Sequence, residues 1–139
     1  VEPIGAEGLL RRGTVEPQPL EQFLGNVRDA LGCPGLRYCD GGKPCARIAV
    51  GGGACGSELQ EAVNSGCDTF VTSDIKYNQF WDAQDLGITL IDAGHFYTEN
   101  PVCAVLADTL RRAFPELEVQ ISQKHIDCMK FFGKPVDFF

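Results

Sequence analysis

The sequence is short of basic residues and of long apolar runs. Twelve Lys and Arg side chains stand against nineteen Asp and Glu, which leaves a formal charge of −7. That sign disfavours a surface that neutralises many phosphates, so we expect no nucleic-acid partner. The longest apolar run, 88–93, is interrupted by Thr89 and Asp92 and is far shorter than the ~20 residues of a membrane span. The N-terminus has no signal-peptide pattern, and we expect a cytoplasmic protein that does not enter a membrane.

The sequence also lacks closely spaced cysteine motifs and has few histidines. The seven cysteines are an odd number and form no C-x-x-C motif or zinc-ribbon spacing, so we predict free thiols that mostly fill the core. Cys55 lies beside Gly56, and we predict that it is accessible and reactive. Only His95 and His125 offer imidazole ligands, whereas a metal site normally has at least about three protein ligands.

The length of 139 residues fits one domain of the usual ~100–200 residues. Residues 1–17 contain several Gly and Pro and no sustained period, which predicts a linker or an edge segment. The chain begins at Val1 rather than Met, so we expect this segment to arrive from an absent first half. Residues 18–139 are then a C-terminal half-domain.

Helical and strand patterns alternate along the rest of the chain. A first helix is predicted from Pro19 to Leu31, followed by an edge strand at 36–39. The regular region then predicts strands at 48–50, 69–72, 88–91 and 117–121 and helices at 57–64, 77–86 and 101–114. Short crossovers between apolar strands favour an α/β fold of three layers, with a mostly parallel sheet flanked by helices. Residues 131–139 hold four of the nine phenylalanines, which predicts a partner surface and self-association.

A glycine-rich loop, Gly51–Gly56, lies between a predicted strand and a predicted helix. It reads G-x-G-x-x-G, and Asp74 follows eighteen residues after its last glycine, as in dinucleotide-binding folds. Three interpretations stay open: a dinucleotide site, a contact with a phosphate or carboxylate, or a structural turn that needs glycine for close packing. Too few units follow the loop for a standard dinucleotide-binding domain.

His95 and Glu99 follow the predicted strand 88–91. We predict that His95 lies in the loop and that Glu99 lies at or just before the start of the helix at Pro101, so that a four-residue step brings imidazole and carboxylate together. This pair suits a divalent cation. The alternative is that His95 caps a strand and Glu99 is a first-turn acid favoured by the helix dipole. The glycine loop also follows a strand, so we expect both features at one crevice.

Three segments together resemble a known family more specifically than any single motif. Arg47–Ser57, Asp68–Tyr77 and Asp92–Glu99, in this order and spacing, resemble the second half of the NIF-three-like dinuclear-metal proteins, often named homologues of type-two GTP cyclohydrolase I. The G-H-x-x-T-E element at Gly94–Glu99 is the most specific part. Gly8–Gly13 resembles the segment that joins the two halves in that family.

The resemblance implies a ring-shaped homohexamer whose protomers have two α/β halves and a two-metal centre between them. His95 and Glu99 match the ligands of the second half, while a His pair and an Asp of the first half have no counterpart here. The family motif G-D-x-K-Y-H has Ser73 and Asn78 here in place of Gly and His, so a proton-transfer role at position 78 is not carried over. The implied cofactors are two divalent cations per intact protomer, with zinc, iron and manganese not distinguished.

The leading functional hypothesis is a metal-dependent hydrolase acting, in its intact form, on an anionic, nucleotide-like substrate. We expect the substrate or its anionic group to contact Gly52, Gly53, Gly56, Ser57, Asp74, Lys76 and Tyr77. A second hypothesis is a non-catalytic metal-handling or interaction protein, and a third is a dinucleotide binder. We expect a hexamer for the intact protein and at least a dimer for this chain.

Overall fold

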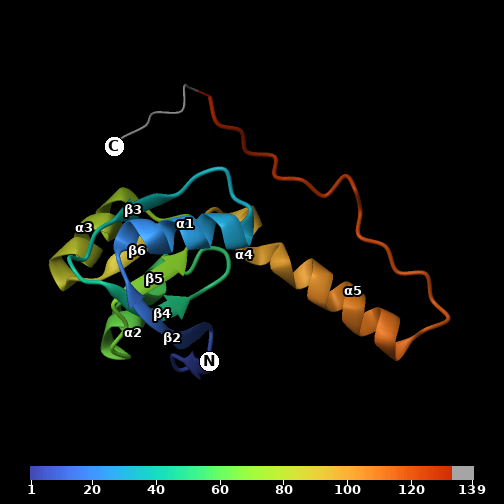
Figure 1. Ribbon diagram of the computed structural model, residues 1–139, viewed down its shortest axis with the longest axis horizontal. Helices are drawn as coiled ribbons and strands as arrows, with labels where there is room; N and C mark the ends of the chain where they lie inside the picture. Colours follow the sequence, from blue (N-terminus) through green and yellow to red (C-terminus); the bar gives the residue numbers. More distant parts are fainter. Residues whose placement is uncertain (133–139) are drawn as a thin grey trace. The chain divides into compact units, whose positions relative to one another are not determined.

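The computed structural model describes residues 1–132 (Figure 1). The chain divides into two units, Val1–Val102 and a second that begins at Cys103. The strands are β1 (Glu2–Ile4), β2 (Leu10–Gln18), β3 (Arg37–Cys39), β4 (Cys45–Val50), β5 (Thr69–Thr72) and β6 (Thr89–Asp92). The helices are α1 (Leu20–Leu31), the short 3-10 helix η1 (Gly56–Glu58), α2 (Leu59–Asn64), α3 (Tyr77–Leu86), α4 (His95–Glu99) and α5 (Pro101–Ala113).

The first unit is built on a six-stranded sheet in the order β1-β2-β4-β5-β6-β3. The strands β4, β5 and β6 are parallel, with Ile48 opposite Thr69 and Phe70 opposite Leu90. The outer pairings, β1 with β2, β2 with β4 and β3 with β6, are antiparallel. The α/β class is therefore confirmed, but the prediction of a mostly parallel sheet is wrong. Parallel pairing is confined to the strands joined by helical crossovers, as such connections require.

The first eighteen residues form the edge of this sheet rather than a free linker. Glu2 pairs with Arg12 across an antiparallel hairpin, and Arg12 pairs with Ala49 of β4. The turn between the strands is closed by the Gly8 N–H, which donates to the Gly5 carbonyl at 3.0 Å. This segment is therefore part of the sheet.

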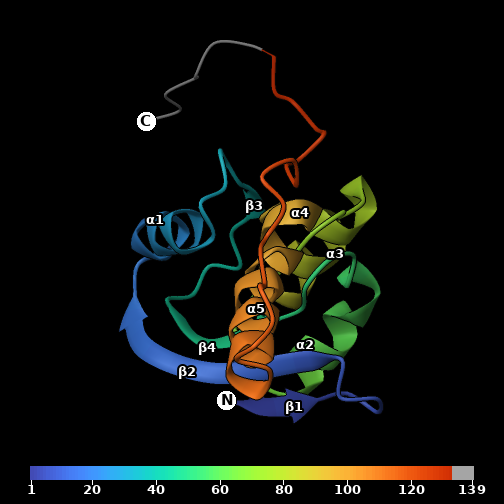
Figure 2. The ribbon, with the colours of Figure 1, turned by 90° about the vertical axis from the view of Figure 1, so that its right-hand side faces the viewer.

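Helices cover both faces of the sheet, which confirms the three layers (Figure 2). Because side chains alternate along a strand, Phe70 and Leu90 pack on the side of α2 and α3, whereas Val71 and Ile91 pack on the side of α1. Phe70, Leu90 and Ile91 have no exposed surface. Burial of each such side chain contributes roughly 1.5–3 kcal/mol, so these strands fix the position of whatever follows them.

The helix ends agree with the sequence. Gly32 and Gly87 end α1 and α3 with left-handed φ values of 64° and 68°, the conformation that favours glycine at this position. No helix in residues 1–132 is long and apolar enough to cross a bilayer.

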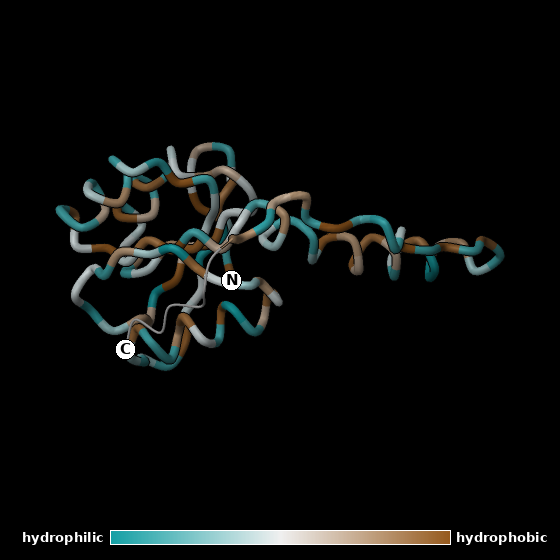
Figure 3. The backbone as a smooth tube through the Cα atoms, turned by 90° about the horizontal axis from the view of Figure 1, so that it is seen from above, coloured by the Kyte–Doolittle hydropathy of each residue, from teal (hydrophilic) through white to brown (hydrophobic). Residues whose placement is uncertain are grey.

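The second unit contains no strand in its described part. The predicted strand Leu117–Ile121 is wrong, because its alternating apolar residues meet no partner strand. The Val119 carbonyl instead accepts a hydrogen bond from the Arg111 guanidinium at 2.9 Å. The helix α5 mixes hydrophobic and hydrophilic residues along its length (Figure 3), and Leu106 and Leu110 are exposed. Phe131 and Phe132 are also exposed, whereas Phe138 and Phe139 lie outside the described residues.

Candidate functional site

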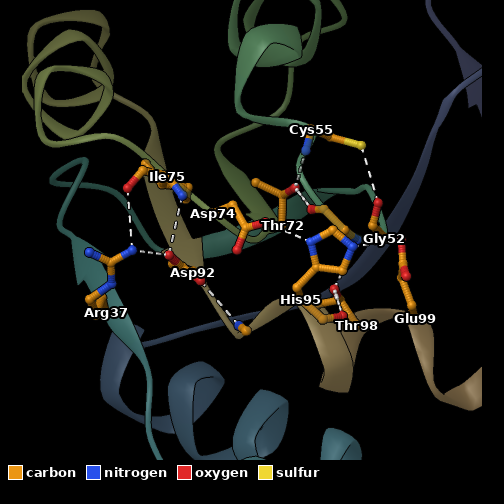
Figure 4. A network of polar contacts seen from close by, with 12 residues as sticks. Arg37, Gly52, Cys55, Thr72, Asp74, Ile75, Asp92, His95, Thr98 and Glu99 are labelled. Carbon is orange, nitrogen blue, oxygen red and sulfur yellow. Dashed lines mark hydrogen bonds and ion pairs between the residues drawn. The ribbon is translucent and has the colours of Figure 1, made fainter. Parts of the chain in front are cut away.

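His95 and Glu99 face one another at the two ends of α4 (Figure 4). The His95 Nε2 lies 3.1 Å from the Glu99 Oε1, and the His95 Nδ1 lies 2.6 Å from the Asp74 Oδ2. The prediction that His95 lies in a loop is wrong, because a separate short helix carries both residues, whereas Glu99 lies just before the helix that begins at Pro101, as predicted. Their four-residue spacing is one turn of that helix, which is why the two side chains meet.

These residues come together because their strands are neighbours. Asp74 follows β5 and His95 follows β6, and the two strands are parallel and adjacent. Gly53 follows β4, which pairs with β5 on its other side. Carboxyl ends of parallel strands lie at one edge of a sheet. The structure therefore brings the glycine loop and His95 to the same place.

Gly53 has a φ of 67° and approaches the paired side chains closely. A Cβ atom at this position would lie 3.1 Å from the His95 Nε2, 3.2 Å from the Glu99 Cδ, and closer still to the Glu99 Oε1. Gly52 approaches the same helix, where a Cβ atom would lie 3.2 Å from the Thr98 carbonyl oxygen. Glycine here keeps open the space beside the imidazole nitrogen and the carboxylate oxygen of the pair. The donor set and this space fit such an ion.

The glycine loop is held in place through two threonines. The Gly53 N–H donates to the Thr98 Oγ1 at 2.9 Å, and the Thr72 hydroxyl donates to the Gly53 carbonyl at 2.9 Å. The Cys55 N–H donates to the same Thr72 hydroxyl oxygen at 3.1 Å. Two backbone N–H groups that could meet a phosphate are thus used within the protein, and an anion would have to be met by other groups.

The remaining predicted pocket residues have contacts of their own. Gly56 and Ser57 line a separate cavity of about 510 Å³ together with Asn78 and Gln79. The Lys76 N–H donates to the Gln79 side chain at 2.8 Å at the start of α3. Tyr77 is 76 % exposed and packs edge-on against Trp81, with ring centroids 6.3 Å apart. Of the predicted set, the structure gathers Gly52, Gly53, Asp74, His95 and Glu99.

Cys55 is not the accessible thiol that the sequence predicts. It is 5 % exposed, and burial raises the pKa of its thiol. The Sγ lies 3.3 Å from the Gly52 carbonyl oxygen as a donor, so the side chain faces into the loop. The prediction that all seven cysteines are free is confirmed.

Sequence reasoning did not identify the buried carboxylate of Asp92 as a link between two turns. Asp92 is 7 % exposed, and its oxygens accept the Gly94 N–H at 3.1 Å and the Ile75 N–H at 3.3 Å. The Arg37 guanidinium binds the same carboxylate and also donates to the Ile75 carbonyl at 3.2 Å. A carboxylate directly after an apolar pair such as Leu90-Ile91 is typical of a cap or a turn, whereas nothing in the sequence singles out Arg37.

The charges around His95 govern its protonation. The hydrogen bond with Asp74 raises the pKa of His95, burial opposes this, and the Glu99 carboxylate raises the pKa further. A cation that binds the Nε2 must therefore compete with a proton. Within residues 1–132, no three His, Cys, Asp or Glu side chains gather as one set of cation ligands, since Asp74 lies on the Nδ1 side of the ring.

Known proteins share this arrangement of strands and helices. The sequence profile of the Duf34/NIF3 (NGG1p interacting factor 3) family matches residues 1–128. A GTP cyclohydrolase 1 type 2 homolog from Nostoc sp. is 34 % identical over 134 residues, which are 94 % of this chain and 51 % of that protein. The chain spans about half the length of the curated relatives it matches.

Two solved structures extend the comparison to the fold. A Staphylococcus aureus protein superposes with a TM-score of 0.78 at 27 % identity, covering 90 % of this chain and 37 % of that one. A Bacillus cereus protein described as related to NIF3 gives a TM-score of 0.73 at 27 % identity, covering 87 % of this chain and 35 % of that one. With its profile matched over most of its length, the chain belongs to the Duf34/NIF3 family.

Proposed function

We propose that His95 and Glu99 bind a divalent cation. The observation that carries the proposal is the 3.1 Å approach of the Nε2 to the Oε1, beside space that only glycine at position 53 keeps open. Two protein ligands do not complete a site. The chain covers about half of its relatives' length, and we propose that the other ligands, and a second cation, belong to the rest of the intact protein.

The activity that we propose for the intact protein is metal-dependent hydrolysis of a small anionic, nucleotide-like substrate. A divalent cation supplies Lewis acidity and lowers the pKa of water. The residues of this chain hold the ligand pair in place: Thr98 fastens the glycine loop to α4, and Asp74 holds the far side of the imidazole. The name GTP cyclohydrolase 1 type 2 homolog, borne by relatives, supports a purine nucleotide as the first substrate to test.

The surroundings of the pair offer two places for a substrate. A cavity of about 340 Å³ lies along Gly51, Gly52 and Thr98 and is otherwise lined by apolar side chains of α1 and the sheet, including Phe23 and Val71. This lining supports contact with the uncharged part of a ligand. For the anionic part we propose the exposed ammonium of Lys76 and the backbone of Gly52, with Tyr77 next to Lys76; Gly56 and Ser57 would contact only a ligand that reaches the second cavity.

We also propose that the protein is cytoplasmic and self-associates. Seven unpaired thiols are typical of a reducing compartment. Exposed apolar side chains on the second unit, among them Leu106, Leu110 and Phe132, support an assembly of at least two copies. A hexamer is our proposal for the intact protein.

The test of the activity is turnover of a panel of purine nucleotides with and without zinc, manganese or iron(II), on the intact protein. We expect metal-dependent product formation that is lost in His95→Ala. Stoichiometric metal without turnover of any nucleotide would support the metal-handling alternative instead. Fluorescence enhancement of NADH or NADPH would contradict both and favour a dinucleotide site.

A further inference from the structure

The two nitrogens of His95 have different partners. The Nδ1 lies 2.6 Å from the Asp74 Oδ2, and the Nε2 lies 3.1 Å from the Glu99 Oε1. A carboxylate only accepts hydrogen bonds, so the protonated ring donates to both carboxylates, and we expect the shorter contact, with Asp74, to keep its hydrogen on the Nδ1 when the ring becomes neutral. In the neutral ring the Nε2 then carries the lone pair, directed toward Glu99 and Gly53.

Asp74 holds an unusual backbone conformation. Its φ is 53°, the only positive value at a residue other than glycine in the part of the chain that the structure describes. Such a conformation is uncommon for a residue with a side chain. It directs the carboxylate to the Nδ1 of a residue 21 positions further along.

A buried carboxylate holds the two turns that carry Asp74 and His95. Asp92 accepts the N–H of Ile75, the residue after Asp74, and the N–H of Gly94, the residue before His95. Arg37 binds both Asp92 and the Ile75 carbonyl. The distance between Asp74 and His95 is thus set by backbone contacts on both sides, independently of any ligand.

We propose that Asp74 is a positioning residue that fixes the tautomer and ring orientation of His95, so that the Nε2 is the atom presented to a cation beside Glu99. This inference rests on the proposed function, since it assigns the ligand atom of the same site. Partners of this kind, hydrogen-bonded to the second nitrogen of a metal-binding histidine, change metal affinity by roughly 10–100-fold when removed.

The tautomer can be measured on the metal-free chain. The ¹⁵N spectrum of the imidazoles at alkaline pH, where the rings are neutral, contains only two histidines, and His125→Gln identifies the signals of His95. We expect the Nδ1–H tautomer in the wild type. In Asp74→Gly, which tolerates the positive φ best, we expect a mixture of tautomers. Asp74→Asn keeps an acceptor oxygen and should keep the Nδ1–H tautomer.

Two controls separate this effect from misfolding and from loss of charge. The backbone amide spectrum of each variant reports whether the sheet is intact, and Asp85→Asn removes an exposed acid on α3 without touching the site. If the wild type carries its hydrogen on the Nε2, or if Asp74→Gly leaves the tautomer unchanged, the inference is wrong.

Titration with zinc then tests the ligand atom. We expect the zinc-induced shift at the Nε2, with affinity lower by roughly 10–100-fold in Asp74→Gly and unchanged in Asp85→Asn. Zinc on the Nδ1 would overturn the inference. A wild type without any response to zinc would contradict the proposed function, while the tautomer of the metal-free chain still decides the role of Asp74.

Discussion

The substitution Gly53→Ala tests whether cation binding needs the space between His95 and Glu99, apart from any effect on the backbone conformation. Gly53 has a φ of 67°, and Gly32, at the end of α1, has a nearly equal φ of 64°. A Cβ atom at Gly32 would meet nothing within 4 Å, whereas at Gly53 it would enter the space between His95 and Glu99. Gly32→Ala is therefore a matched control for backbone strain alone.

Both variants should lose a similar amount of stability, because a left-handed conformation costs an L-residue roughly 1–2 kcal/mol. The end of the flexible Glu99 side chain, which is about half exposed, can move away from the new methyl group at Gly53→Ala. The added cost in stability should therefore be small. The effect on cation binding should be large, because the methyl group occupies the proposed position of the cation and moves the Glu99 Oε1 away from the His95 Nε2.

The assay is urea unfolding together with zinc titration for both variants. We expect each to lower the free energy of unfolding by about 1–2 kcal/mol and only Gly53→Ala to abolish the binding of zinc. If Gly53→Ala bound zinc as the wild type and Gly32→Ala do, the space beside Gly53 would be a packing feature and our account of the site would be wrong.

Three further predictions concern the buried carboxylate, pH and assembly. Asp92→Ala should cost roughly 1–3 kcal/mol, because it leaves the N–H groups of Ile75 and Gly94 without their acceptor; urea unfolding that matches the control Asp85→Ala would contradict this. The raised pKa of His95 stabilises the metal-free fold at pH below the unfolded value of ~6.5, and this contribution is lost as pH rises through the folded pKa. The affinity for zinc should rise over the same pH range, because the proton no longer competes with the cation. Calorimetry on His95→Gln should show neither dependence on pH. Light scattering across a dilution series should show at least a dimer, and a monomer of 15.1 kDa at high concentration would refute self-association.

The sequence was sufficient where local pattern and burial agree. The strands at Thr69–Thr72 and Thr89–Asp92 are fully buried, so their apolar character marked them, and glycine marked the ends of α1 and α3. The meeting of His95 with Glu99 also followed from spacing. These features depend on residues that are close in the chain.

Features that depend on distant partners were missed or misjudged. The strand Leu10–Gln18 contains Gly13 and Pro17 and is mostly exposed, so its place in the sheet comes from pairing with β4 rather than from its own residues. Leu117–Ile121 has the alternation of a strand but no strand to pair with in the described chain. Arg37 and Asp92 are 55 positions apart, and no local pattern links them.

The most direct test of the central claim is a zinc titration of this chain by calorimetry, comparing the wild type with Glu99→Gln. This substitution keeps the shape of the side chain and removes the charge that a cation requires. Glu21→Gln, an exposed acid in the first turn of α1, is the control for the loss of a helix-dipole interaction. We predict weak binding in the wild type and in Glu21→Gln, since two ligands leave the site incomplete, and at least ~10-fold weaker binding in Glu99→Gln. Equal affinity in all three proteins would contradict the assignment of His95 and Glu99 as a cation site.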